Sequence, residues 1–263
     1  MREQIEGINI YKHPRLTDPC LIAAWPGIAS VASTVVTYLR TSLGAQEFAE
    51  VHPVPFYDLE GAFVEDNLIQ SARFPESKFY YWKNKQHHRD LIIFEGEAQP
   101  KYYGYQLAGK VVDFAQKFNV KRIYTLAAAL VQQFSQQPRV WAAASDPELL
   151  EGLRSQGLVL KGNFYVAGMN GVLLSVAKEK QLEGICLLGE TPEFPNEVGN
   201  PFAALSMLEA LARVLELDYD LTELRESAKV TYEEIERTLS KSRSDFLDQF
   251  TVSLWDSSED DDG

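Results

Sequence analysis

The strongest constraint on the fold is a recurring pattern in which a short apolar run ends at a tight turn and leads into a segment with helical periodicity. The first run is Cys20–Trp25, which is followed by Pro26 and Gly27 and then by the helical segment Ile28–Leu43. A short apolar run bounded by Pro and Gly residues is typical of a strand that is buried on both faces. The pattern therefore predicts a strand, a sharp turn and a helix near the start of the chain.

The same alternation continues after Phe56–Lys83, an aromatic-rich segment that we interpret as a β-rich excursion or hairpin. Further strands are predicted at Asp90–Phe94, Val120–Leu126, Arg139–Ala144, Phe164–Ala167 and Gly184–Leu188. Helices are predicted between or after them, at Tyr103–Phe118, Pro147–Gly157, Gly168–Lys180 and Pro201–Leu215. Alternation of this kind indicates an α/β fold with a mainly parallel sheet flanked by helices.

The chain is expected to form one α/β core domain with two C-terminal additions. Its 263 residues are near the upper limit for a single hydrophobic core. The core domain is predicted to span residues 1–218, and residues 219–252 are expected to form a helical appendage with an apolar stripe made by Leu224, Ala228, Ile235 and Leu239. Residues 253–263 are acidic and polar, and they are expected to be disordered.

Charge and composition narrow the possible partners and the compartment. The formal net charge is −13, and an acidic surface repels phosphate backbones, so nucleic acid is not an expected partner. No apolar stretch approaches the roughly 18 residues that a membrane span needs, and the polar start lacks the apolar core of a signal peptide. The two cysteines, Cys20 and Cys186, lie far apart and suit a reducing compartment. A cytoplasmic location is expected.

Standard signatures of catalysis, nucleotide binding and metal binding are absent from the sequence. The chain has no Walker A motif, no dinucleotide-binding glycine motif, no serine nucleophile elbow and no zinc-binding His-Glu-x-x-His motif. Two of the four histidines, His87 and His88, are adjacent in a charged segment. Neighbouring side chains on an extended segment point apart, so solvated loop histidines are favoured over a metal site. No catalytic residue, metal ligand or cofactor is predicted.

Four turns at the ends of predicted strands form the candidate site. In parallel sheets the loops that follow the carboxyl ends of the strands line the cleft where ligands bind. Backbone N–H groups near Gly27 and Gly171 could hold an anion, and Glu95, Glu97 and Glu190 could converge on the same rim. The alternative is that these glycines only allow the chain to turn. The candidate residues of the cleft are Trp25, Gly27, Glu95, Gly96, Glu97, Gly168, Asn170, Gly171, Glu190 and Thr191.

The same turns carry a resemblance to a known family. Five segments, in order, resemble those of the proteasome assembly chaperone 2 family: Leu21–Ser30, Leu91–Pro100, Ala167–Gly171, Leu188–Pro192 and Asn200–Ala204. The resemblance covers roughly residues 8–240. It implies a phosphorylase-like, three-layer α/β core with a helical C-terminal appendage. It also implies that the chain self-associates or pairs with a related subunit.

Eukaryotic and archaeal members of that family assist assembly of the proteasome core particle, so the resemblance implies proteasome α-type subunits as possible partners. Chaperones of this kind can dock through a C-terminal motif that consists of a hydrophobic residue, a tyrosine and any residue. The last residues here, Glu259–Gly263, contain neither a tyrosine nor a hydrophobic residue. Docking by that route is therefore not expected.

Two hypotheses for the function follow from these observations. The first is a non-enzymatic, oligomeric binding or assembly-chaperone-like protein, for which the aromatic side chains of Phe56–Trp82 are candidate interface anchors. The second is an enzyme or sensor that binds a small anionic or nucleoside-like ligand in the cleft at the strand ends.

Overall fold

The structure is a computed structural model that describes residues 3–5, 7–59, 61–85, 89–133, 135–192, 199–230 and 233. The chain divides into two compact units, Met1–Asp220 and Leu221–Gly263. In the second unit, residues 222–230 are helical. His87, His88, Ile235, Leu239 and the acidic tail 253–263 lie outside the described residues. None of the described helices is long and apolar enough to cross a membrane.

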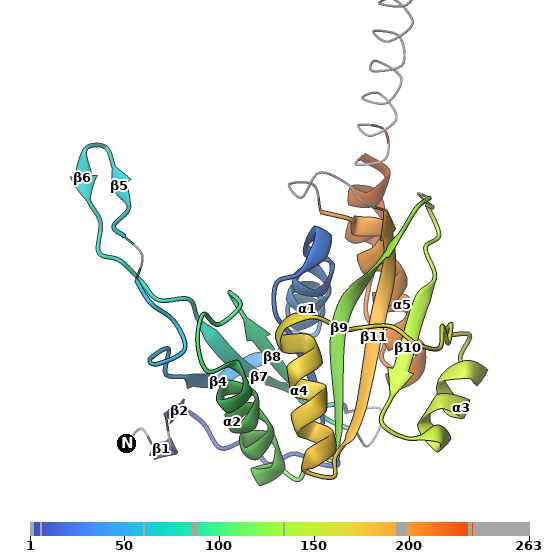
Figure 1. The fold of residues 1–263 in the computed structure, drawn as a ribbon, viewed down its shortest axis with the longest axis horizontal. Coiled ribbons are helices and arrows are strands. Elements are labelled where there is room, and N and C mark those ends of the chain that lie inside the picture. Colours follow the sequence, from blue (N-terminus) through green and yellow to red (C-terminus); the bar gives the residue numbers. More distant parts are fainter. Residues whose placement is uncertain are drawn as a thin grey trace, which may run out of the picture. The chain divides into compact units, whose positions relative to one another are not determined.

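A nine-stranded sheet forms the centre of the first unit in the described part of the chain. Figure 1 shows the sheet with helices packed against it. From one edge to the other, the strands are β1 (Glu3–Ile5), β2 (Ile8–Ile10), β4 (Gln46–Val51), β7 (Ser77–Trp82), β8 (Leu91–Gly96), β3 (Cys20–Ala24), β9 (Arg122–Val131), β11 (Glu183–Pro192) and β10 (Val140–Ala144).

The middle of the sheet is parallel and its two sides are antiparallel. Strands β8, β3, β9 and β11 run parallel to one another. Antiparallel pairs join β1, β2, β4 and β7 to one side of this group, through β8, and β10 to the other side, through β11. Every residue of β3 is buried, as expected for a central strand covered on both faces. In β7, buried residues alternate with half-buried ones at its start, which is typical of a strand with one face toward water. The predicted α/β class with a sheet flanked by helices is confirmed.

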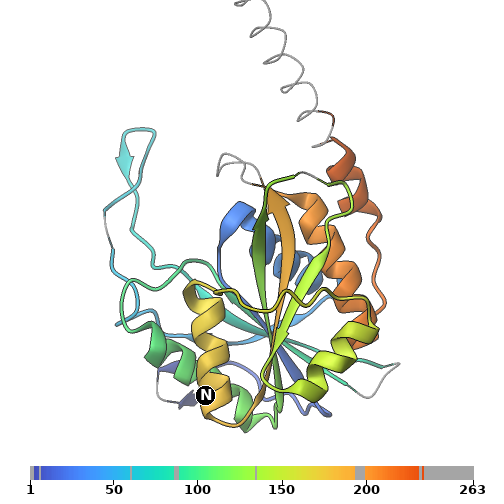
Figure 2. The ribbon, with the colours of Figure 1, turned by 45° about the vertical axis from the view of Figure 1, so that its right-hand side comes forward.

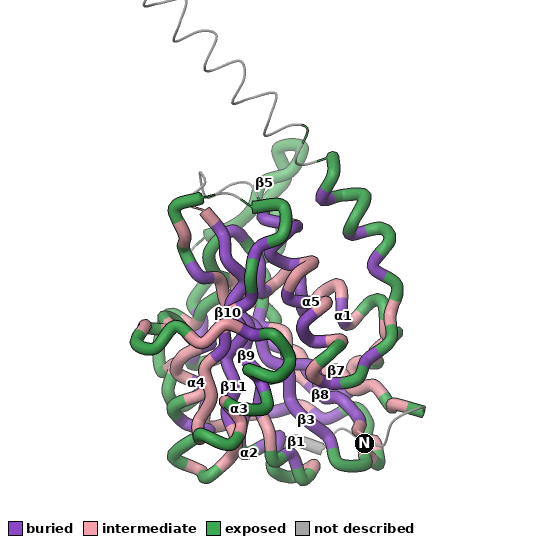
Figure 3. The backbone as a smooth tube through the Cα atoms, turned by 90° about the vertical axis from the view of Figure 1, so that its right-hand side faces the viewer, coloured by how far each residue is buried: buried purple, intermediate pink, exposed green. Residues whose placement is uncertain are grey.

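Helices cover both faces of the sheet and produce three layers (Figure 2). Helices α1 (Val31–Ser42) and α5 (Pro201–Leu215) pack together on one face, and α2 (Gly104–Lys117) and α4 (Gly168–Glu179) pack together on the other. Helix α3 (Pro147–Ser155) packs beside β10, and the 3-10 turn η1 (Ile28–Ser30) precedes α1. The buried backbone in Figure 3 follows the central strands and the inner sides of these helices.

The core between the sheet and α2 is rich in aromatic side chains. Phe79 is the centre of this group, with its ring centroid 4.5 Å from that of Phe114, 4.8 Å from that of Phe94 and 6.2 Å from that of Phe48. All four side chains are almost completely buried. These four rings therefore pack the core, where such pairs stabilise the fold beyond the area that they bury.

Two predicted elements can be compared with the structure directly. The excursion after Phe56 contains the small hairpin β5 (Val64–Glu65) and β6 (Leu68–Ile69) and then β7, as predicted. The prediction of a strand at Phe164–Ala167 is wrong, because those residues have no regular structure. The outer edge of β10 is already paired with Val159, whose N–H and C=O bond to Val140 and Ala142 at 2.9 Å. A further strand therefore has no adjacent edge to join.

Candidate functional site

The turns after β3 and β8 and the start of α4 meet at one edge of the sheet. Strands β3 and β8 are parallel neighbours, so their carboxyl ends lie side by side. The carboxamide of Asn170, in the first turn of α4, binds the backbone of Trp25: its Oδ1 accepts from the Trp25 N–H at 3.1 Å, and its Nδ2 lies 3.4 Å from the Trp25 carbonyl oxygen. Asn170 is buried, and its side chain joins α4 to the end of β3.

A second carboxamide makes a matching link from the turn after β8. The Nε2 of Gln99 donates to the carbonyl of Pro26 at 2.7 Å, and its Oε1 accepts from the N–H of Met169 at 3.0 Å. Gly168, with a φ of +68°, lies directly against this amide, since a Cβ there would be 3.2 Å from Gln99 Nε2. Two amide side chains thus connect three turns, and we call this arrangement the amide junction. The sequence analysis did not include Gln99, although it lies within one of the five family-like segments.

Two glycines are fixed by close packing in the same region. A Cβ on Gly96 would lie 2.4 Å from the Cδ1 and Nε1 atoms of the fully buried Trp25 indole. A Cβ on Gly171 would lie 2.0 Å from the carbonyl oxygen of Val166. Neither position has space for any side chain. Close packing is therefore sufficient to explain why glycine occupies positions 96 and 171.

Gly27 differs from the other glycines of the candidate site. Its backbone is extended, with a φ of −157°, and a Cβ there would meet nothing within 4 Å. The left-handed conformation of this turn occurs instead at Ala29 and Ser30, with φ values of 48° and 51°. The Ser30 N–H also bonds back to the Gly27 carbonyl at 3.2 Å. Neither a left-handed backbone conformation nor close packing therefore requires a glycine at position 27.

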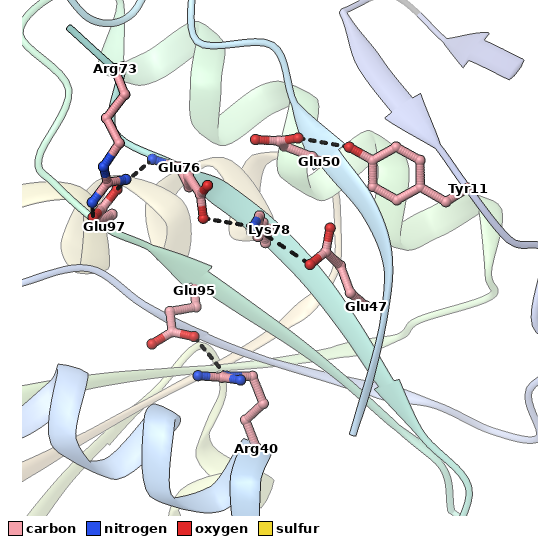
Figure 4. Close-up of polar contacts among 9 residues, drawn as sticks. All are labelled: Tyr11, Arg40, Glu47, Glu50, Arg73, Glu76, Lys78, Glu95 and Glu97. Carbon is pink, nitrogen blue, oxygen red and sulfur yellow. Dashed lines mark hydrogen bonds and ion pairs between the residues drawn. The ribbon is translucent and has the colours of Figure 1, made fainter. Parts of the chain in front are cut away.

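The three candidate carboxylates do not all converge: Glu95 and Glu97 line one cavity, Glu190 lies elsewhere, and each one is paired with a different arginine. Glu95 accepts from Arg40 Nε at 2.9 Å and from the Thr37 hydroxyl at 2.5 Å. Glu97 forms a two-pronged ion pair with Arg73 at 2.9 and 2.5 Å (Figure 4). These hydrogen bonds from Arg73 hold the pKa of Glu97 below its ordinary value.

Glu190 and Thr191 lie at the other side of the sheet, beside β10. The carboxylate of Glu190 accepts from the Trp141 indole at 2.7 Å and pairs with the Arg139 guanidinium at 2.9 Å. Burial by itself would raise the pKa of Glu190, but the hydrogen bonds from Arg139 and Trp141 outweigh it and lower the pKa overall. The Thr191 hydroxyl accepts from Asn200, whose own Oδ1 caps α5 by accepting from two backbone N–H groups.

Three of the predicted residues line one cavity of about 310 Å³ between α1 and the sheet. Glu95, Gly96 and Glu97 contribute to it, together with residues that the sequence analysis did not single out: Ala24, Pro26, Ser33, Val36, Arg40, Glu76, Lys78 and Tyr80. The Arg40 guanidinium lies 4.7 Å from the centre of the Tyr80 ring. The period of two along β7 places Lys78 and Tyr80 on one face, and this signal was available in the sequence.

The cavity has a mixed charge that is balanced within the fold. Lys78 is paired with Glu76 at 2.6 Å and lies 3.5 Å from Glu47 (Figure 4). With Arg40 bound to Glu95, both cations of the cavity have carboxylate partners. Such a site can offer hydrogen bonds and a polarised surface to a small polar molecule, but a ligand anion would have to compete with these internal carboxylates.

Among the described residues, nucleophilic or metal-ligating groups do not gather. The thiols of Cys20 and Cys186 are both buried, and burial raises their pKa to about 12, so neither is a reactive thiolate near neutral pH. In the described part of the chain no three His, Cys, Asp or Glu side chains are placed to hold a metal ion.

Comparisons with known proteins identify similar chains. A family model described as the PAC2 family matches residues 21–239. Among curated proteins, the chain is 24% identical over 227 residues to an uncharacterised protein, MJ1210, of Methanocaldococcus jannaschii, a match that covers 84% of this chain and 83% of the relative.

Among solved structures, the chain is similar to PbaB of Pyrococcus furiosus, described as an archaeal proteasome activator. The two are 32% identical, with a TM-score of 0.76 over 89% of this chain and 98% of the other. A proteasome-assembly chaperone homologue of Mycobacterium tuberculosis, Rv2125, has a similar fold, with 20% identity and a TM-score of 0.70 over 83% of this chain and 94% of the other.

Proposed function

Because the chain belongs to the PAC2 family, whose model matches residues 21–239, we propose that it acts by binding other proteins, as an oligomeric, assembly-chaperone-like factor. Its partners are proteasome-related: a second copy or a related subunit, and proteasome α-type subunits. It works in the cytoplasm, where such subunits are assembled.

One observation carries this proposal. The chain is 32% identical to an archaeal proteasome activator over 89% of its length, so the similarity spans nearly the whole chain rather than one motif. The local chemistry agrees with a binding role. The turns that resemble a ligand cleft are joined by Asn170 and Gln99, and Glu95, Glu97 and Glu190 are each paired with an arginine.

Reciprocal affinity capture from the native organism tests the proposal. The tagged chain is expected to retrieve proteasome α-type subunits, and a tagged α-type subunit is expected to retrieve the chain, with an unrelated acidic protein of similar size as the control. Reconstitution from purified components should then give a complex on a native gel. Failure of both directions and of the reconstitution would contradict a proteasome-related role.

A second candidate function is an enzyme or sensor for a small anionic or nucleoside-like ligand. The observation in its favour is the cavity of about 310 Å³ that contains Arg40 and Lys78. Thermal-shift measurements with phosphate, sulfate and nucleosides on the wild type and on Arg40→Ala separate the two functions. We expect shifts below about 2 °C. A dose-dependent rise of several degrees that is lost in Arg40→Ala would favour the ligand-binding function instead.

A further inference from the structure

A protruding hairpin exposes an unusual set of apolar side chains. Residues 58–72, which we call the arm, leave the body of the domain after Tyr57 and include β5 and β6 (Figure 1). Four large apolar residues of the arm have high exposed fractions: Phe63 71%, Val64 57%, Leu68 66% and Ile69 79%. Contiguous exposed apolar surface on a folded domain marks an interaction site.

The arm has little to hold it in place by itself. Val64 pairs with Ile69 and Glu65 with Leu68, so the hairpin has only two short strands. A two-stranded hairpin is marginally stable in water unless its side chains pack against another surface. Val64 and Ile69 share one face of the hairpin, and Leu68 lies on the opposite face beside Glu65. An occupant that stabilises the arm must therefore contact both faces, as a groove does.

The same chain carries a groove of suitable size at the base of the arm. This groove, of about 640 Å³, is lined by the base of the arm itself, including Leu59 and Phe63, and by residues next to the arm and in the loop after β8, including Tyr57, Arg73, Gln99 and Lys101. Next to it, Tyr102 and Tyr103 are 45% and 56% exposed. The two tyrosines directly follow Lys101 of the groove, and the backbone N–H groups of Lys101 and Tyr102 bond to the carbonyl of Phe56, which precedes Tyr57 of the groove.

The charges of the arm and of the groove are complementary. The arm contains four acidic residues, Asp58, Glu60, Glu65 and Asp66, and no Lys or Arg. The groove contributes the Lys101 ammonium, which lies 5.7 Å from the Tyr102 ring, and the guanidinium of Arg73, which is 69% exposed and paired with Glu97. A carboxylate of a docked arm would share Arg73 with Glu97, whereas Asp58 already lines the groove from the same chain. An acidic hairpin tip with apolar flanks thus matches a surface that combines cations with aromatic rings.

We propose that the arm of one copy docks in the groove at the arm base of a second copy. The arm and the groove lie next to each other on one chain. In a dimer with a two-fold axis, each copy can therefore insert its arm into the groove of the other, so that both arm–groove contacts form and no arm or groove is left unoccupied. This inference rests on the self-association proposed above and names the surfaces that carry it. A different protein as the occupant is the alternative outcome of the test.

Disulfide trapping between two single variants tests the contact directly. Ile69→Cys in the arm and Tyr103→Cys beside the groove are purified separately, mixed and oxidised. The native thiols are buried, so the background is low. We expect a covalent heterodimer of the two variants to accumulate severalfold faster than in a mixture of Ile69→Cys with Leu130→Cys, where Leu130 is exposed on β9. Equal rates in the two mixtures would overturn the proposal.

Light scattering supplies the second measurement, without any cysteine. The wild type is expected to have a mass at least twice that of the 29.7 kDa chain at micromolar concentrations. The double variant Phe63→Ser/Ile69→Ser should raise the dissociation constant about tenfold or more, whereas Leu130→Ser should leave it unchanged. All three substituted sites are exposed, so circular dichroism should match the wild type.

Other outcomes separate this inference from the proposed function. A monomeric wild type would overturn the inference, and so would an oligomer that the arm variant does not weaken. If the arm variant stays oligomeric but no longer captures α-type subunits, the arm docks on a different protein, and the second copy is the wrong occupant. If it becomes monomeric and still captures them, the inference stands and the proposed partners are retained.

Discussion

The amide junction and the arm differ in how much freedom the fold leaves their residues. At the junction, Trp25 is completely buried, and a Cβ on Gly96 would overlap its indole at 2.4 Å. On the arm, Ile69 is 79% exposed. The turns of the junction lie in the segments that resemble a known family, yet packing and hydrogen bonds within the fold account for the residues found there. The arm has no motif, yet it presents the surface that packing leaves unexplained.

The largest expected effect that tests this difference is at Gly171. A Cβ there would lie 2.0 Å from the Val166 carbonyl oxygen, which is backbone and cannot move alone. We expect Gly171→Ala to lower the free energy of unfolding by about 3 kcal/mol or more, measured by urea denaturation. The matched control is Gly109→Ala in α2, where nothing lies within 4 Å and a small stabilisation of about 0.5 kcal/mol is expected. Equal effects of the two substitutions would contradict the packing argument.

A smaller effect is expected from Asn170→Ala. The substitution leaves the buried N–H of Trp25 without its acceptor, which should cost about 1–3 kcal/mol of unfolding free energy. At protein concentrations too low for self-association, the same denaturation experiment should show a change within about 0.5 kcal/mol for Ile69→Ser on the arm. If the arm substitution proved as costly as Asn170→Ala, the arm would be packed against the body, and the contrast between the two regions would fail.

Glu190 provides a pH-dependent test beyond the junction. Its pKa is lower in the folded chain than the ordinary value of 4.5, so its contribution to stability is complete above that value and is lost as the pH falls through the folded pKa. Glu190→Gln removes the titration. The difference in unfolding free energy between the wild type and this variant is therefore expected to shrink on going from neutral pH to a pH well below 4.5. A difference that is constant with pH would show that the ion pair with Arg139 does not form in solution.

The smallest effect is expected at Gly27, which lies in a turn of the candidate site but should tolerate substitution as well as an exposed residue of the arm does. It is extended, exposed and has open space around its Cα, so Gly27→Ala should change the melting temperature by about 2 °C or less. A loss of several degrees would mean that this turn is as tightly constrained as the one at Gly171.

Local signals in the sequence predicted much of the fold. The N-caps at Asp146 and Asn200 form as the following prolines indicate, with Asp146 accepting from the Leu149 N–H. Such caps depend on residues within a few positions, so the sequence contains all the information needed. The strand expected at Phe164–Ala167 failed because its formation depends on a free sheet edge, which Val159 occupies.

The candidate site was only partly predictable for the same reason. The parallel order of β3 and β8 brings Trp25 and Gly96 together, as the position of turns at strand ends suggests. The arginines that pair with the three carboxylates come from a helix, from the segment after the arm and from the residue before β10. Which arginine meets which carboxylate is decided by tertiary packing, and no spacing in the sequence encodes it.

The amide junction also has a consequence for the order of folding. The bond between Trp25 and Asn170 closes a loop of 145 residues, and the bond between Gln99 and Pro26 closes one of 73. Contacts between such distant positions carry a large entropic cost before they yield any stabilisation, so they belong to the late steps of folding. Loss of the Asn170 amide should accordingly accelerate unfolding while leaving the refolding rate nearly unchanged. The junction would then provide kinetic stability, because it would slow the unfolding rate much more than it changes the folding rate.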